Sequence, residues 1–442
     1  MDIKLSDHFT YKRLIRFTLP SVIMMIFTSI YGVVDGIFVS NLVGKTPFAA
    51  INLIMPVCMI FGSIGFMVGT GGSALVSMTL GQGNSKRANE IFSMLIYVSL
   101  LSSAVLAALG FIFLEPIAVA LGAEGEMLKD CLTYGRILIP ASVAFVLQNE
   151  FQSFLICAEK PKLGLFVTVC AGVTNIVLDA LLIAGLGLGL VGAAVATAIS
   201  QIVGAVIPLL FFAFNKKSIL RLTGAPFDGK ALLKTCANGS SEMMTNLSLS
   251  IVNILYNFQL ISLAGEDGVA AYGVIMYINF IFISVYIGFS VGSAPIISYH
   301  YGAQNSSELK SLSKKSLALV AVCAVIMTAF AELLSAPLSG IFVGYDKALF
   351  EMTRRGFMIY SVSFLIMGFN IFASSFFTAL NNGIVSAVLS FARTLLFQVI
   401  SVILLPIILG LDGIWLSITA AELFALGLSA FFFVKMRKRY DD

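Results

Sequence analysis

Four polar side chains within apolar stretches have the types and spacing to bind a proton or a small cation. Asp35 lies deep in the first apolar stretch, and Asn175 and Asp179 lie four residues apart in the fifth. Residues i and i+4 share one face of a helix, so this amide and this carboxylate can converge on one ion. Thr197, in the next apolar stretch, can add a hydroxyl group. Burial disfavours the charged form of a carboxyl group, which favours H⁺, and the same oxygens would suit Na⁺.

Polar side chains inside apolar stretches are energetically unfavourable unless they have a function or a partner. A carboxylate in hydrocarbon costs at least about 2.5 to 3.5 kcal/mol on insertion scales, and such residues usually face a cavity and carry ions or protons. We therefore predict that the set of Asp35, Asn175, Asp179 and Thr197 is a coupling site for H⁺ or Na⁺. The alternative is that the four groups form structural hydrogen bonds between helices, worth about 0.6 kcal/mol each.

Other charges within apolar stretches allow further interpretations. Glu242 could be a second acid for coupling or for substrate, or it could have a structural partner near the membrane interface. Arg393 and Glu422 lie at similar depths in two consecutive stretches. A buried ion pair that fixes a helical hairpin is the better interpretation of these two residues.

Methionine and aromatic side chains could line a pocket for varied ligands, because they repack readily. A cationic ligand would be attracted both by ring faces and by buried acids. Most of the 37 Phe, 17 Met and 13 Tyr residues will simply face lipid or other helices. The cavity candidates are Met24, Met25, Tyr31, Met55, Tyr256 and Tyr277.

The elements that position these residues follow from composition. The 442 residues are 59% hydrophobic and 11% charged, with a mean hydropathy of +0.98. Apolar runs of about 20 to 30 residues match the length that a helix needs to cross roughly 30 Å of hydrocarbon. The short alternating segments of a β-barrel are absent. We predict an all-α integral membrane protein with spans near 14–43, 48–78, 91–113, 132–157, 162–185, 190–214, 232–263, 268–298, 312–335, 352–378, 384–409 and 413–434.

The distribution of basic residues predicts the topology. Twelve spans place both termini on one side of the membrane. Of the 27 Lys and Arg residues, 20 fall on that side and 6 on the other, while Arg393 lies within a span. Because cytoplasmic loops carry the excess of Lys and Arg, both termini are expected in the cytoplasm of a bacterial cell, with the chain in its plasma membrane. The net charge of +4 then reflects topology rather than a nucleic-acid partner.

Several kinds of site are not expected. The six cysteines show no C-x-x-C spacing and the chain has two histidines, so we expect no disulfide, no zinc and no metal other than the possible Na⁺. No nucleotide-binding G-x-x-x-x-G-K-[ST] motif occurs; the near miss at Gly44-Lys45-Thr46 has Val39 where the first glycine belongs. With no catalytic constellation, the sequence predicts no enzyme and no cofactor.

The chain is an internal duplication. A shift by half the chain length, which carries Ala49 onto Ala270, aligns the two halves without a gap, and six of the thirteen residues from 49 to 61 are then identical. Because each half has an even number of spans, the halves insert with the same orientation and are related by a pseudo-twofold axis along the membrane normal. We predict two six-helix lobes, 1–214 and 235–442, joined by a cytoplasmic linker, 215–234. Transporters built in this way place their site between the lobes and alternate access by rocking, which is an argument from fold analogy.

The duplication fails at the candidate site. Polar residues of the first half are matched by apolar or aromatic residues in the second. The pairs are Asp35 with Tyr256, Asn175 with Leu396, Asp179 with Ile400 and Thr197 with Ile418.

At this point the sequence resembles the multidrug and toxic compound extrusion (MATE) family, over essentially the whole chain. The first half carries Pro20, Asp35-Gly36, Gly44, Ala49-Ala50, Pro56, Gly71, Ala74, Ser77 and Gly81, and the second half carries Gly292, Pro295, Ser298, Gly302 and Asn305. The resemblance implies two lobes around a V-shaped cavity and export of cationic, often aromatic, drugs driven by inward H⁺ or Na⁺. It implies that Asp35 is the proton or cation switch, completed by Asn175, Asp179 and Thr197. Glu242 matches a family glutamate, whereas no aspartate lies in span 10, which favours coupling in the N-terminal lobe.

We therefore predict a monomeric multidrug antiporter that exchanges cationic drugs or toxic metabolites for H⁺ or Na⁺ across the lipid bilayer. The alternative is a flippase of a lipid-linked oligosaccharide, from the same superfamily. Such a flippase needs cations in its cavity for pyrophosphate, and the cavity candidates here are mostly acidic. A membrane scaffold or receptor would have no use for duplicated lobes with acids inside the spans.

Overall fold

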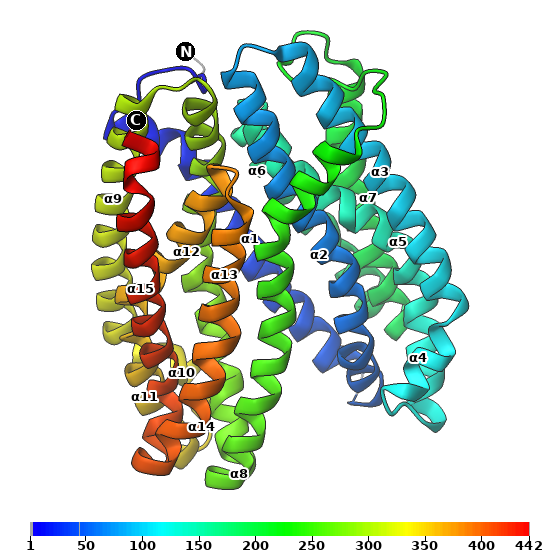
Figure 1. Cartoon of the computed structure of the whole chain (residues 1–442). Helices are drawn as coiled ribbons and strands as arrows, with labels where there is room; N and C mark the ends of the chain where they lie inside the picture. The colour runs from blue at the N-terminus through cyan, green and yellow to red at the C-terminus, as the bar shows by residue number, and fades with distance from the viewer. Residues whose placement is uncertain (1–2, 44, 442) are drawn as a thin grey trace.

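The computed structural model describes residues 3–43 and 45–441, so Gly44 of the family pattern lies outside the described residues. The regular elements of these residues are helices (Figure 1). The first half contains α1 (Tyr11–Leu42), α2 (Lys45–Gly81), α3 (Ser85–Ile112), α4 (Leu114–Ala120), α5 (Gly125–Cys157), α6 (Pro161–Asp179), the π-helix η1 (Ala180–Gly185) and α7 (Gly189–Phe214). The second half contains α8 (Gly229–Gly302), α9 (Ser306–Leu333), α10 (Ser335–Val343), α11 (Lys347–Ser361), α12 (Phe364–Ala379), α13 (Gly383–Phe391), the π-helix η2 (Ala392–Leu396), α14 (Phe397–Leu409) and α15 (Leu411–Asp441).

Twelve membrane spans are confirmed within the described residues. Ten helices are long and apolar enough to cross a bilayer, and the pair α11 and α12, bent by 50°, forms one more span. The 74-residue α8 counts as two, because Gly265 breaks it with φ 63° and ψ −150°. Glycine tolerates this left-handed region, so α8 turns there from one span into the next.

Four short elements were not predicted. The helices α4 and α10 lie between spans at equivalent places in the two halves, since residues 114–120 shifted by half the chain fall on 335–341. The two π-helices do not repeat in this way. The residues of the second half that match η1 lie in the ordinary helix α14, and the residues of the first half that match η2 lie in the ordinary helix α6. The duplicated scaffold is therefore distorted at different heights in its two halves.

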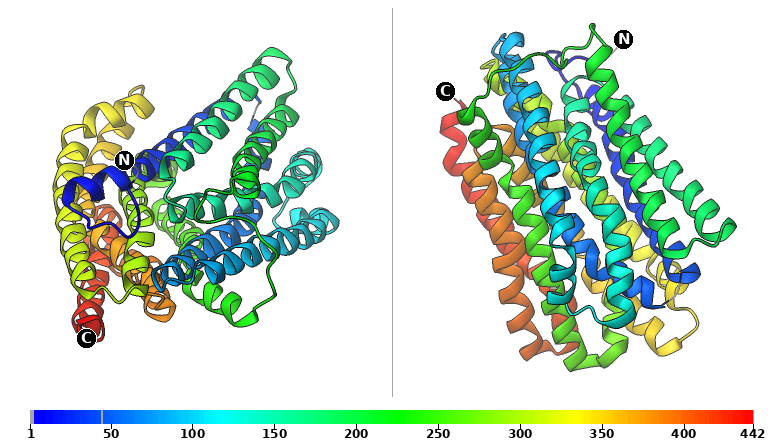
Figure 2. Two further views of the ribbon diagram at one scale, coloured as in Figure 1. Left: turned by 90° about the horizontal axis from the view of Figure 1, so that it is seen from above. Right: turned by 90° about the vertical axis from the view of Figure 1, so that its right-hand side faces the viewer.

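The helices form two bundles that stand side by side. Viewed from above, α2–α7 (blue to green) occupy one side and α9–α15 (yellow-green to red) the other (Figure 2). The dark-blue α1 begins beside the second bundle, and both α1 and α2 contact α8. Both termini lie at the same end of the molecule, which we call the terminal end (Figure 1).

Close helix crossings join the bundles where α2 and α8 end. A Cβ atom placed on Gly81 would lie 2.0 Å from the Tyr299 carbonyl oxygen, and one on Gly302 would lie 2.0 Å from the Met78 carbonyl oxygen. The duplication pairs Gly81 with Gly302 and Met78 with Tyr299, so the two contacts are the same contact made twice. Small residues let membrane helices approach this closely. The pseudo-twofold relation predicted from the sequence is thus visible in the packing.

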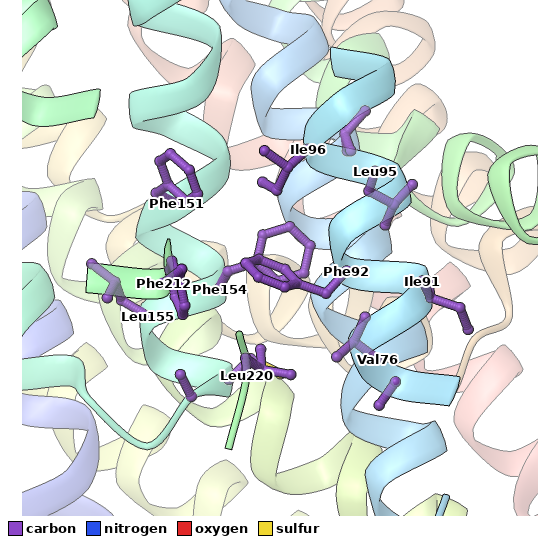
Figure 3. Close-up of a cluster of buried hydrophobic side chains, with 14 of the residues drawn as sticks. Val76, Ile91, Phe92, Leu95, Ile96, Phe151, Phe154, Leu155, Phe212 and Leu220 are labelled. Carbon is purple, nitrogen blue, oxygen red and sulfur yellow. The ribbon is translucent and has the colours of Figure 1, made fainter. Parts of the chain in front are cut away.

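An aromatic cluster fills the core of the first bundle near the terminal end (Figure 3). Phe92 contacts Phe154 and Phe212 with ring centroids 4.9 Å and 4.8 Å apart, and Phe151 stacks on Phe212 at 5.7 Å. Leu220, from the segment between the two halves, is fully buried in the same cluster. This packing anchors the connecting segment to the first bundle.

Candidate functional site

The structure brings Asp35, Asn175 and Asp179 together. Asp35 lies on α1, and the other two lie on the neighbouring α6, where their exposed fractions are 2% for Asn175 and 0% for Asp179. The side chains of Asp179 and Asn175 are within hydrogen-bonding reach of the Asp35 carboxyl group. The i, i+4 spacing on α6 accounts for their shared face.

Local features of α6 allow this approach. A Cβ atom on Gly172 would lie 2.5 Å from the Phe27 ring and 3.0 Å from the Tyr31 ring, so only glycine lets this part of α1 pack so tightly. Asp179 is the last residue of α6, and the π-helical η1 begins at the next residue. Single π-helical turns occur frequently at functional sites. The pattern of residues carries no sign of this turn.

Most oxygens of this cluster lack donors. Both carboxyl oxygens of Asp179, one of Asp35 and the amide oxygen of Asn175 are buried with no hydrogen-bond donor among the described residues. Asp35 and Asp179 can hydrogen-bond each other only if one of them carries a proton. Two adjacent carboxyl groups, one of them fully buried, cannot both ionise cheaply, so the arrangement favours a shared proton or a bound cation.

Two further residues belong to the surroundings of this cluster. Tyr134 of α5, 2% exposed, lies within electrostatic reach of both Asp35 and Asp179, and Tyr31 lies within reach of Asp35. The sequence analysis missed Tyr134, whose only signal is a phenol group inside an apolar stretch. Thr197 on α7 is half-buried, and within the described residues its hydroxyl group forms no hydrogen bond to the cluster.

The second half carries a satisfied network instead. Arg393 Nε donates to Glu422 Oε1 at 2.8 Å, and Asn370 Nδ2 donates to Glu422 Oε2 at 2.7 Å. Ser429 Oγ in turn donates to Asn370 Oδ1 at 3.0 Å. Glu242 lies within electrostatic reach of Arg393. Asn370 was not singled out from the sequence, although the duplication pairs it with Asn149 and so marks a polar residue kept in both halves.

The six cavity candidates do not share one environment. Met24 and Tyr256 are buried at 1% and 2% exposure, and Tyr256 stacks on Tyr272 with centroids 4.8 Å apart. Met25, Tyr31 and Met55 are half-buried. Tyr277 is 44% exposed and lies parallel to the Phe342 ring at 6.3 Å.

A family of known proteins matches this chain once in each of its two halves. The family model MatE matches the chain twice, over residues 20–181 and 243–404. A curated relative, the multidrug export protein MepA of Staphylococcus haemolyticus, is 23% identical over 431 residues, which cover 97% of this chain and 94% of the relative.

Solved structures share the fold. A crystal structure of MATE in the straight conformation has a TM-score of 0.91 and 23% identity, covering 98% of this chain and 97% of that one. The outward-facing conformation of a multidrug resistance MATE family transporter of the MOP superfamily also has a TM-score of 0.91 and 23% identity, covering 98% and 96%. Because the two MatE matches together cover well over half of the residues, the chain belongs to the MatE family of transporters.

Proposed function

We propose that this transporter exports drugs by antiport, exchanging a cationic or aromatic molecule for H⁺ or Na⁺. The observation that carries the proposal is the adjacent carboxyl pair Asp35 and Asp179, because three of their four oxygens are buried without a donor among the described residues. The naming of MepA as a multidrug export protein supports the choice of cargo. The family membership supports transport rather than catalysis.

In the proposed cycle, a proton or Na⁺ binds between Asp35 and Asp179 and removes the repulsion between their charges. Loss of that repulsion lets α1, α6 and α7 rearrange, with Thr197 completing the ion site in one of the two arrangements. Substrate binding on the outside is thereby weakened, and the carrier resets. Exchange of one H⁺ for one monovalent cation moves no net charge, so each pH unit supplies about 1.36 kcal/mol, which sustains a tenfold drug gradient.

The lobes that move are residues 1–214 and 235–442 in this proposal, with both termini in the cytoplasm of a bacterium. The 6 Lys and Arg residues on the opposite side against 20 on the terminal side support this orientation. Rocking would occur about the interface of α1, α2 and α8, where the glycine crossings lie. We propose that the functional unit is the monomer, since one chain already supplies both lobes.

A flippase for a lipid-linked oligosaccharide remains the alternative. That function needs cations free to bind pyrophosphate. Arg393, the cation that the sequence places deep in a span, is engaged by Glu422 at 2.8 Å. The geometry at this residue therefore favours export of cations over flipping of an anionic head group.

The test is ethidium efflux from loaded cells or everted vesicles under an imposed pH gradient and, separately, an imposed Na⁺ gradient. Wild type should respond to one gradient, and Asp35→Asn should lose the response because the amide cannot take up a proton. Asp267→Asn, at an exposed position, is the matched control and should behave as wild type.

Two outcomes would contradict the proposal. Efflux by Asp35→Asn equal to wild type would remove Asp35 from the mechanism. Absence of efflux in the wild type under both gradients would move the assignment to the flippase.

A further inference from the structure

A short irregular segment with a turn at residues 5–7 precedes α1 and crosses the terminal end of the molecule. We call residues 3–10 the N-terminal strap. The backbone N–H of Leu5 donates to Glu159 Oε1 at 2.6 Å, in the loop between α5 and α6. The backbone N–H of Phe9 donates to Glu308 Oε1 at 2.8 Å, on α9. The strap is thus hydrogen-bonded to the first bundle through Leu5 and to the second bundle through Phe9.

Apolar packing fixes the strap further. Leu5 and Phe9 are 1% and 0% exposed, in a cluster that also contains Ile156 of α5 and Leu312 of α9. Lys315 Nζ donates to the Phe9 carbonyl oxygen at 2.5 Å. Because both side chains and backbone are held, the strap presents a defined surface rather than a loose terminus.

A cationic pocket of about 720 Å³ lies between the strap and the start of α1. Four cations and one acid line it, together with Ile3 and Thr10: Lys4, Lys12, Arg13, Arg16 and Asp7. Arg13 Nη1 donates to the His8 carbonyl oxygen at 3.0 Å. Lys4, Lys12 and Arg16 are exposed and form no ion pair with a described residue. The pocket therefore carries a net positive charge that attracts anions.

The cationic pocket continues into an apolar stripe on the same helix face. Lys12, Arg16, Leu19 and Ile23 follow one another at i, i+4, i+7 and i+11, so they lie one above another on α1. Leu19 and Ile23 are 48% and 43% exposed. Cations at the mouth of a span are ordinary on topological grounds alone. Exposed apolar residues are equally ordinary on a span, because they face lipid. What this face adds is a pocket lined by four cations that ends at Arg16, one helical turn from Leu19, and this combination matches a molecule with an anionic head and apolar tails.

We propose that this pocket binds the phosphate head group of an anionic phospholipid, with its acyl chains along the stripe of Leu19 and Ile23. The head group would bridge Lys4 of the strap and the cations of α1. Because the strap is bonded to Glu159 and Glu308, the bound lipid stabilises the contact between the bundles at the terminal end. This site is separate from Asp35 and Asp179, and it does not depend on the transported molecule.

The test measures lipid binding to the purified full chain in detergent. Phosphatidylglycerol is titrated against phosphatidylcholine with the same acyl chains, and thermal stability reports binding, since a ligand that binds only the folded state raises the unfolding temperature. Lys12→Gln with Arg16→Gln should bind phosphatidylglycerol roughly 30-fold more weakly, at about 1 kcal/mol for each cation removed. Lys216→Gln with Lys217→Gln removes the same charge from exposed positions of the connecting segment and should bind as wild type.

Two further arms decide the ligand. Rising NaCl should reduce the preference of the wild type for phosphatidylglycerol, because the interaction is electrostatic and screened; this arm needs no variant to fold. Glycerol 3-phosphate and inorganic phosphate should stabilise the wild type far less than the lipid. If the wild type and both double variants preferred phosphatidylglycerol equally, the pocket would not be the binding site. If free phosphate stabilised the wild type as much as the lipid does, the ligand would not be a phospholipid.

Discussion

At the scale of single residues, hydrogen-bond satisfaction separates the two polar clusters. The carboxylate of Glu422 receives hydrogen bonds from Arg393 and Asn370, so its charge is compensated in place. The carboxyl oxygens of Asp179 receive no donor from the described residues. Buried polar atoms are nearly always bonded, and those that are not often mark a site for something not yet bound. The first cluster is thus suited to exchange an ion and the second to hold helices together.

A double-variant cycle tests the structural role of the second cluster. Arg393→Met leaves Glu422, which is 0% exposed, as a buried unpaired charge, and we expect a loss of about 3 to 5 kcal/mol. Adding Glu422→Gln removes that charge and should restore most of the stability. The exposed pair Arg355 and Asp412 is the control, because an exposed pair contributes only about 0 to 1 kcal/mol. Thermal unfolding in detergent measures all of these variants; an Arg393→Met protein as stable as Arg355→Met would contradict the structural role.

At the scale of elements, helix ends repeat across the duplication while internal distortions do not. Asn84 caps α3 by accepting from the Arg87 N–H, and Asn305, its equivalent in the second half, caps α9 by accepting from the Glu308 N–H. A side-chain acceptor at this position satisfies an N–H that the helix itself leaves free. The residue that caps the start of α8 also forms an ion pair. Asp228 accepts from the N–H groups of Lys230 and Ala231 and also pairs with Arg87 of α3.

This cap gives a pH dependence with a definite sign. The N–H groups of Ala231 and Lys230, together with Arg87, hold the pKa of Asp228 below its usual value. Its stabilisation is therefore present above the usual pKa of aspartate, about 3.9, and is lost as the pH falls through the lowered value. Asp228→Asn keeps an acceptor but not the charge, so it should melt below wild type at pH 7 and approach wild type in acid. Asp346→Asn, which caps α11 without an ion pair to a described residue, should show a smaller difference; equal differences would contradict the role of Arg87.

At the scale of the whole molecule, the two bundles are held together by crossings of α1 and α2 with α8. A Cβ atom on Gly71 would lie 2.1 Å from the Thr235 carbonyl oxygen, and one on Gly239 would lie 1.9 Å from the Met67 carbonyl oxygen. Neither backbone can yield without moving a span. The two bundles therefore meet at contacts where backbone lies against backbone.

Adding one methyl group at such a crossing should be costly. Gly71→Ala forces α2 away from α8, and overpacking of this kind destabilises by about 1 to 3 kcal/mol. Gly273→Ala, on α8 with nothing within 4 Å of the added Cβ atom, is the matched control and should be neutral or slightly stabilising. Unfolding temperature and drug efflux are both measured. Identical behaviour of the two variants would show that the lobes do not require this close approach.

Features that depend on the local sequence could be predicted, and features that depend on packing between distant segments could not. Span positions and the pairing of the halves depend on hydropathy and on a repeat of half the chain, which are written along the sequence, and both were predicted. The convergence of Asn175 and Asp179 follows from helix periodicity, and the structure brings both side chains to Asp35. The role of this set as an ion site stays a prediction. The π-turns, the strap and the partner Tyr134 depend on packing between distant segments, for which a single sequence carries little signal. Asn370 had one signal, its match with Asn149 in the repeat, but that match does not identify Glu422 as its partner. The role of Thr197 also stays a prediction, since its hydroxyl group forms no hydrogen bond to the acids within the described residues.

The reciprocal contact of Gly81 with Tyr299 and of Gly302 with Met78 has the self-complementarity of a symmetric homodimer. The chain can be regarded as two subunits of such a dimer joined covalently by the segment between Phe214 and Gly229. In a true homodimer both subunits would have to carry the same acids, and every ion site would occur twice. Joining the subunits removes that constraint, so one copy can keep Asp35 while the other places Tyr256 at the same position. The single polypeptide is thus what permits one copy of the proposed ion site per molecule.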